Sequence, residues 1–214
     1  VSWCSIHVST IWGTPETGAW VVISTIILDL GGVYLHGSIK NFLARAEHIL
    51  DRPITHEAGE VYFDVALNTG KESPRKSFAR IFEIPEKDAN MDRLLRIWER
   101  NWQPGPAMVA LLQRLKHNYT LAALSNSDIG TYTYGRQHDW FTLFDHLFLS
   151  HELGLLKPDP AFFEIALDTM DVAADECIYV DDQMSIIEVA ASIGFHALHY
   201  ESTEKLEHQL NNIL

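Results

Sequence analysis

The sequence predicts an α/β protein with a Rossmann-like, doubly wound parallel sheet into which an α-helical domain is inserted. Two observations support this prediction. In the second half of the 214-residue chain, short apolar runs alternate with segments of helical periodicity, which is typical of a parallel sheet covered by helices on both faces. Residues 39–102 differ from this half, because they contain helical patterns and no strand-like run.

The core elements can be placed in order along the chain. We expect the strands of the sheet, each a short apolar run, at residues 23–28, 119–124, 146–150, 177–180 and 196–200. We expect the core helices at residues 106–117, 159–170 and 184–193. Pro106 suits the first turn of a helix and Gly194 suits a helix C-cap, so both support these boundaries. Ser127 and Asp128 are expected to lie in a loop, which is followed by a stretch of polar and aromatic residues up to Trp140.

The chain is expected to divide into three parts. Residues 21–37 and 103–214 should form the α/β core, residues 38–102 a helical lobe, and residues 1–20 an N-terminal extension of unknown role. The run Gln103-Pro104-Gly105-Pro106, where the lobe rejoins the core, is typical of a boundary. Within the lobe we expect helices at residues 39–50, 57–68, 73–82 and 88–102.

The composition argues against several classes of partner. With 16 Lys and Arg against 29 Asp and Glu, the net charge of −13 disfavours nucleic acids and anionic membranes, because both need a basic surface. No stretch reaches the ~18 to 20 apolar residues of a membrane span. Cys4 and Cys177 lie far apart in sequence and are not expected to form a disulfide. We therefore expect a cytoplasmic protein, either a monomer or a homodimer.

Four short polar motifs stand beside the predicted strands. They are Asp29-Leu30-Gly31-Gly32, Ser125-Asn126, Lys157-Pro158 and Asp181-Asp182. Each motif alone fits ordinary turn or loop chemistry. Together they should meet at the carboxyl edge of the sheet, which is where open α/β sheets bind ligands. The sequence therefore predicts a site for a metal ion and a phosphate.

The residue types of these motifs suit phosphate chemistry. Asp29 could attack phosphorus or carbon to form a covalent intermediate. The hydroxyl of Ser125 and backbone N–H groups could hold phosphate oxygens, and the ammonium of Lys157 could neutralise a developing oxyanion. The adjacent carboxylates of Asp181 and Asp182 repel each other unless a cation compensates them, and Mg²⁺ prefers such oxygen ligands.

The four motifs together resemble those of the haloacid dehalogenase (HAD) superfamily. The similarity spans roughly residues 23–200, and the helical lobe resembles the α-helical cap of that family. The phrase Phe148-Leu149-Ser150-His151-Glu152-Leu153-Gly154 is most similar to that of small sugar-phosphate phosphatases, including the glucose-1-phosphatase-like group. The resemblance implies a phosphatase that hydrolyses a small phosphate monoester, most simply a sugar phosphate, with Mg²⁺ as cofactor.

The resemblance also implies a role for each site residue. Asp29 would be the nucleophile that becomes an aspartyl-phosphate, and Lys157 would stabilise its charge and that of the phosphoryl group. Ser125, Asn126 and Lys157 would bind the phosphoryl group. The ligands of Mg²⁺ would be the Asp29 carboxylate, the Gly31 backbone carbonyl and Asp182, with Asp181 in a supporting or water-mediated role.

Two departures from the family pattern leave alternatives open. Gly31 stands where phosphatases usually carry a second aspartate as general acid and base, and His36 or a cap residue would have to replace it. Ser185 and Ile186 lie in a stretch that often carries another acidic residue and an asparagine. One alternative is a 2-haloacid dehalogenase, although Asp181-Asp182 fits a metal site better than a halocarboxylate pocket. The other is a non-catalytic binding protein on a decayed phosphatase scaffold.

Overall fold

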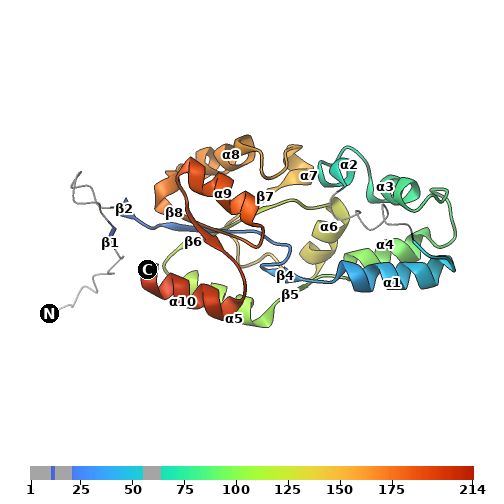
Figure 1. The fold of residues 1–214 in the computed structure, drawn as a ribbon, viewed down its shortest axis with the longest axis horizontal. Coiled ribbons are helices and arrows are strands. Elements are labelled where there is room, and N and C mark those ends of the chain that lie inside the picture. The colour runs from blue at the N-terminus through green and yellow to red at the C-terminus, as the bar shows by residue number, and fades with distance from the viewer. Residues whose placement is uncertain (1–10, 13–20, 55–63) are drawn as a thin grey trace.

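A five-stranded parallel sheet forms the centre of the protein in the computed structural model, which describes residues 11–12, 21–54 and 64–214 (Figure 1). The strand order is β7-β6-β3-β8-β9. The bounds of these strands, in chain order, are β3 Thr25–Leu28, β6 Thr120–Ser125, β7 His146–Leu149, β8 Cys177–Asp181 and β9 His196–His199. The predicted Rossmann-like fold class is confirmed.

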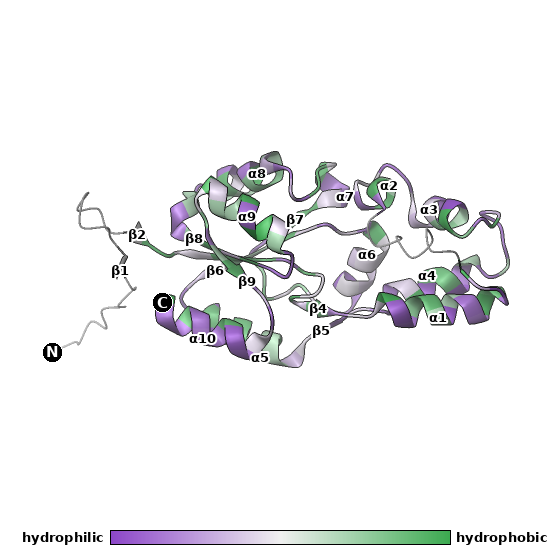
Figure 2. Ribbon diagram, viewed as in Figure 1, coloured by the Kyte–Doolittle hydropathy of each residue, from purple (hydrophilic) through white to green (hydrophobic). Residues whose placement is uncertain are grey.

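Helices cover both faces of the sheet, so every central strand is apolar on both sides (Figure 2). Successive side chains of a strand point to opposite faces. On β3, Ile26 and Leu28 pack into the core that contains residues of α5 (Pro106–Leu115) and α10 (Thr203–Ile213). Ile27 packs into the other core, with residues of α8 (Pro160–Met170) and α9 (Met184–Ile193).

The described part of the lobe, residues 38–54 and 64–102, forms four helices beyond one end of the sheet (Figure 1). They are α1 Ile39–Leu50, α2 Val65–Asn68, α3 Pro74–Ile81 and α4 Met91–Glu99. Their shared core is a cluster of aromatic rings, in which Phe42, Phe78 and Trp98 lie with centroids 5.0–6.1 Å apart. Ser73 caps α3 by accepting a hydrogen bond from the Lys76 amide, and Pro74 occupies the first turn.

A pair of short antiparallel strands connects the lobe to the core. β4 (Leu35–His36) carries the chain into the lobe, and β5 (Gln103–Pro104) carries it back. Two hydrogen bonds also link the two parts: Trp98 Nε1 donates to Asp128 Oδ2 at 2.9 Å, and Ser150 Oγ donates to the Asn68 carbonyl at 2.5 Å. The predicted domain boundaries at residues 38 and 103 fall beside the strand pair, and the division into domains stays a prediction.

The polar and aromatic stretch that follows Asp128 forms helix α6 (Ile129–Gln137), which the sequence did not predict. Gly130, Thr131 and Gly135 are poor helix formers, and no apolar stripe marks the segment, so periodicity did not reveal it. The N-cap residue compensates for this low helix propensity, since the Asp128 side chain accepts hydrogen bonds from the amides of Gly130 and Thr131.

Other differences concern the ends of elements. The strand predicted to reach residue 150 ends at Leu149, where α7 (Ser150–Leu153) begins, and the predicted helix 88–102 is shorter as α4. Most of the predicted helix 57–68 lies outside the described residues, which show α2. β1 (Ile11–Trp12) lies within the predicted extension and pairs with β2 (Val21–Val22), which follows the extension. Among the described residues, no helix has the length and apolar character needed to cross a membrane.

The aromatic cluster gives a prediction about stability. Phe78 is fully buried and contacts three other rings, so Phe78→Ala should lower the free energy of unfolding by about 3–5 kcal/mol, through lost burial and a cavity. Urea denaturation followed by tryptophan fluorescence measures this loss. Ile165→Ala, at a position 36% exposed on α8, serves as control and should cost less than about 1 kcal/mol. Equal losses in both variants would show that the lobe is not packed as described.

Candidate active site

The four motifs meet at the carboxyl edge of the sheet, as the parallel topology requires. Asp29 directly follows β3, Ser125 ends β6 and Asp181 ends β8. Lys157 arrives on the loop between α7 and α8. Asn126 holds this loop through two hydrogen bonds: its Nδ2 donates to the Lys157 carbonyl at 3.1 Å, and its Oδ1 accepts from the Lys157 amide at 2.8 Å.

The ammonium of Lys157 lies between two carboxylates. Its Nζ is 2.7 Å from Asp29 Oδ1 and 2.7 Å from Asp181 Oδ2, and all three side chains are almost completely buried. Burial alone would lower the pKa of Lys157, but the charges of Asp29 and Asp181 outweigh it and raise this pKa above its ordinary value. The lysine therefore stays positively charged in the interior.

The nucleophile candidate Asp29 has a perturbed pKa. Burial, with a smaller contribution from the charges of Asp181 and Asp182, raises the pKa of Asp29 to about 6 against the opposing charge of Lys157. Carboxylates with such shifts in a cleft are candidates for catalysis or metal binding. A cation bound beside Asp29 would favour its ionised form.

The Asp181 carboxylate accepts three hydrogen bonds from neighbouring groups. Its Oδ2 accepts hydrogen bonds from Lys157 Nζ and from the Tyr179 hydroxyl at 2.8 Å, and its Oδ1 accepts from the Gln183 amide at 2.9 Å. Burial and the neighbouring carboxylates raise the pKa of Tyr179 well above its ordinary value, so the phenol remains a donor. These bonds favour the supporting role over direct metal ligation by Asp181.

The acidic residues fit a divalent metal ion. Asp29, Asp181 and Asp182 each offer a carboxylate oxygen, and these oxygens lie within 4.8 Å of one another. Asp182 lies against Gly32, where a Cβ would come within 2.2 Å of Asp182 Oδ2. Gly32 also has a φ of +81°, so glycine is needed there both for the turn and for the approach of Asp182. The Gly31 carbonyl as a ligand stays a prediction.

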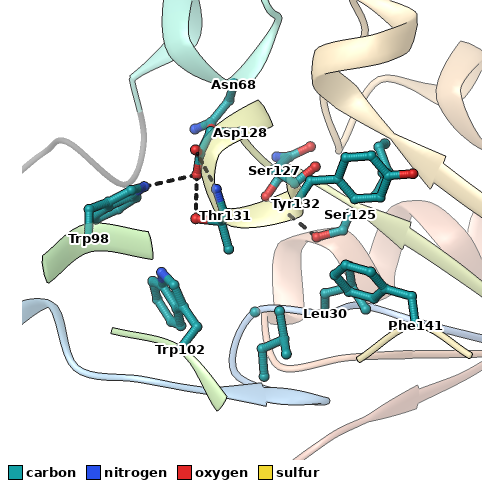
Figure 3. Close-up of a pocket in the computed structure, with 14 residues that line it drawn as sticks. Leu30, Asn68, Trp98, Trp102, Ser125, Ser127, Asp128, Thr131, Tyr132 and Phe141 are labelled. Atoms are coloured by element: carbon teal, nitrogen blue, oxygen red, sulfur yellow. Dashed lines mark hydrogen bonds between the residues drawn. The ribbon is translucent and has the colours of Figure 1, made fainter. Parts of the chain in front are cut away.

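Two adjoining cavities open at this edge. One is the phosphate-side cavity, lined by Asp29, Asn126, Lys157 and Ser185 among others. The second, the inner pocket, lies between the core and the lobe and has a cavity volume of about 40 Å³ (Figure 3). Ser125 lines the inner pocket, and Asn126 lines both cavities, so the predicted phosphoryl-binding residues stand where the two meet.

His36, Ser185 and Ile186, on which the alternatives from the sequence depend, lie in different parts of the structure. His36 lies exposed on β4, with its ring beside Gly105, and lines neither cavity. Its geometry therefore does not support a role as the missing general acid. Ile186 is 2% exposed in the apolar core, although it also borders the phosphate-side cavity, so an acidic residue there would have to be buried. Ser185 lines the cavity beside Asp29.

Sequence reasoning missed the part of the site that the lobe contributes. Asn68, at the end of α2, lines both cavities, and Trp98 and Trp102 line the inner pocket (Figure 3). Tyr132 of α6 and Phe141 complete its aromatic lining. Helical periodicity places such residues on an apolar face, but no sequence signal shows that the face borders a cavity rather than a packed core.

The chain is similar to three characterised proteins. It is 32% identical over 208 residues to drimenol cyclase drtB of Aspergillus calidoustus, covering 90% of this chain and 37% of that protein. It is 32% identical over 99 residues to sesquiterpene phosphatase astK of Aspergillus oryzae, covering 45% of this chain and 50% of that protein. It is 23% identical over 209 residues to D-ribitol-5-phosphate phosphatase of Bacteroides thetaiotaomicron, covering 90% of this chain and 99% of that protein. The chain thus matches half or less of the length of the two fungal proteins.

Solved structures share the fold. A HAD family enzyme of Bacteroides thetaiotaomicron, crystallised in complex with magnesium and inorganic phosphate, matches with a TM-score of 0.69 at 20% identity, covering 87% of this chain and 98% of that one. The model of the haloacid dehalogenase-like hydrolases matches residues 23–194, a region that contains all four motifs. The resemblance seen in the sequence is confirmed: the chain belongs to the haloacid dehalogenase-like hydrolase family.

Proposed function

We propose that this protein is a Mg²⁺-dependent phosphatase that hydrolyses a small phosphate monoester through an aspartyl-phosphate on Asp29. The observation that carries the proposal is the buried contact of Lys157 with Asp29, next to the carboxylate of Asp182. A nucleophilic carboxylate, a fixed positive charge and a set of metal-binding oxygens at one sheet edge suit phosphoryl transfer, which depends mainly on positioning and charge neutralisation.

The proposed reaction has two steps. Asp29 forms a bond to phosphorus while the bond between phosphorus and the ester oxygen breaks, and the alcohol leaves with a proton taken from solvent. Water then attacks the phosphorus of the aspartyl-phosphate, which releases inorganic phosphate and restores Asp29. Lys157 neutralises charge on the transferring group, and Ser125 and the Asn126 amide hold its oxygens.

The metal-binding residues of the proposal are Asp29, Asp182 and the Gly31 carbonyl, with Asp181 in support. A bound Mg²⁺ supplies positive charge to the phosphoryl oxygens. The acidic cluster supports this cofactor, and the related enzyme crystallised with magnesium and phosphate agrees with it. The same cluster disfavours the dehalogenase alternative, which needs no metal.

The relatives support two classes of ester. The similarity to D-ribitol-5-phosphate phosphatase supports a polyol or sugar phosphate, which was the expectation from sequence. The similarity to sesquiterpene phosphatase supports a terpenoid ester. Both classes belong in the substrate panel, together with p-nitrophenyl phosphate, a simple ester, and acetyl phosphate, a mixed anhydride.

The first prediction from this proposal concerns the nucleophile. Asp29→Asn should lower Mg²⁺-dependent phosphate release from the best ester by at least ~10³-fold, because an amide cannot form the covalent intermediate. Phosphate release with Mg²⁺ and with chelator measures this. Asp168→Asn, the same change at an exposed position of α8, should retain activity. Undiminished turnover by Asp29→Asn would refute the mechanism.

The second prediction concerns metal binding and pH. Metal ligands must be deprotonated, and burial raises the pKa of Asp29 to about 6 and also raises that of Asp182. In the metal-free protein, ionisation of Asp29 therefore lowers the free energy of unfolding as the pH rises from 3.8 to about 6. Mg²⁺ should offset this loss, so the increase in Tm on adding Mg²⁺ should be larger at pH 7.5 than at pH 5.

The control for this measurement is Asp182→Asn, which should remove most of the Mg²⁺-induced increase in Tm at pH 7.5. Differential scanning fluorimetry of chelator-treated protein, with and without added MgCl₂, gives the four values needed. An increase at pH 5 that equals the increase at pH 7.5 would contradict metal binding by these carboxylates.

The third prediction compares two glycines with positive φ. Gly32→Ala and Gly154→Ala should each cost about 1–2 kcal/mol of stability, because both backbones are left-handed, with φ values of +81° and +71°. Only at Gly32 would the new methyl group displace Asp182, since nothing lies within 4 Å of a Cβ at Gly154. Isothermal titration with Mg²⁺ should show weaker binding by Gly32→Ala alone. Similar weakening in both variants would contradict the placement of Asp182.

A further inference from the structure

We propose that the alcohol part of the substrate is an apolar, branched hydrocarbon group and that it binds in the inner pocket between the core and the lobe. This inference rests on the proposed phosphatase function and names the class of ester. It departs from the sugar phosphate expected from the sequence. The evidence is the position of the pocket, the chemistry of its walls and the state of its polar groups.

The position of the pocket suits a leaving group. Asn68 and Asn126 line both the inner pocket and the phosphate-side cavity, so the two spaces adjoin at the phosphoryl-binding residues. An ester whose phosphate lies beside Asp29 and Lys157 can therefore extend its alcohol part into the inner pocket. The cavity has a volume of about 40 Å³, so it can hold the part of the alcohol nearest the phosphate.

The walls of the pocket are apolar and come from both parts of the molecule (Figure 3). The core and α6 contribute Leu30, Leu35, Tyr132 and Phe141, while the lobe contributes Trp98 and Trp102. Tyr132 and Phe141 stack with ring centroids 5.6 Å apart and an interplanar angle of 28°. Such walls favour hydrocarbon, since each methylene removed from water strengthens binding about fourfold.

Several polar groups of the inner pocket already have partners within the protein. Asp128 Oδ2 accepts hydrogen bonds from Trp98 Nε1 and from Thr131 Oγ1 at 2.8 Å, and Asp128 Oδ1 accepts from two amides. Ser127 Oγ lies 3.0 Å from His151 Nδ1. Among the described lining residues there is no Lys or Arg. A sugar would bury several hydroxyl groups, each of which loses binding energy unless the protein pairs it.

The test compares esters that share a phosphate and differ in the alcohol part. The apolar esters are geranyl and farnesyl monophosphate, used below the concentrations at which they form micelles, and the polar esters are ribitol 5-phosphate and glucose 1-phosphate. Acetyl phosphate, a mixed anhydride, is the reference, because its acetate leaving group carries no branched hydrocarbon. We expect kcat/KM to be at least ~10-fold higher for the apolar esters than for the polar ones.

A pair of variants on α6 tests whether the inner pocket causes the preference. Tyr132→Gln replaces a ring of the pocket wall, and Tyr134→Gln makes the same change two residues away, at a ring that contacts His138 and Trp140 instead. Tyr132→Gln should lower the ratio of kcat/KM for farnesyl monophosphate to that for acetyl phosphate by about tenfold. Tyr134→Gln should leave this ratio at the wild-type value.

The outcomes separate the two proposals. A preference for ribitol 5-phosphate or glucose 1-phosphate, or a ratio that Tyr132→Gln does not change, would overturn the apolar substrate and leave the phosphatase in place. Absence of phosphate release from every compound tested, acetyl phosphate included, would overturn the proposed phosphatase function and with it this inference. Because the variants are compared by a ratio of two substrates, a general loss of folded enzyme does not imitate the expected result.

Discussion

The buried ammonium of Lys157 holds the site together. Its Nζ lies 2.7 Å from the carboxylates of Asp29 and Asp181 and supplies the opposite charge that buried carboxylates require. The two hydrogen bonds of Asn126 to the Lys157 backbone fix the loop that delivers this charge. One lysine thus joins the loop after β6, the ends of β3 and β8 and the loop before α8. The position of the Asp29 carboxylate follows from that contact.

The sheet and its polar edge could be predicted because they depend on local patterns and one topological rule. Apolar runs mark buried strands, and parallel strands present their carboxyl ends at the same edge. Asp29, Ser125 and Asp181 therefore had to lie close together once their strands were recognised. Lys157 follows no strand directly, but its position shortly after the run 146–150 placed it at the same edge. The structure adds that the Asp181 carboxylate accepts three hydrogen bonds, which no sequence pattern reveals.

The inner pocket could not be predicted, since its walls come from residues that are remote in sequence. The periodicity of α4 identifies Trp98 as part of an apolar face, but packing alone decides that this face meets Phe141 and Tyr132 across a cavity. Helix α6 was not predicted because its glycines and threonines have low helix propensity. This helix carries part of the pocket wall. The features that select a substrate were therefore the least visible in the sequence.

The bond between Trp98 and Asp128 has a mechanical consequence. Trp98 belongs to the lobe, while Asp128 caps the helix that carries the opposite wall of the pocket. A rotation of the lobe about the β4–β5 pair would have to break this bond together with the one from Ser150 to Asn68. The two buried hydrogen bonds therefore resist that rotation, and a ligand that contacts both walls of the pocket would resist it as well.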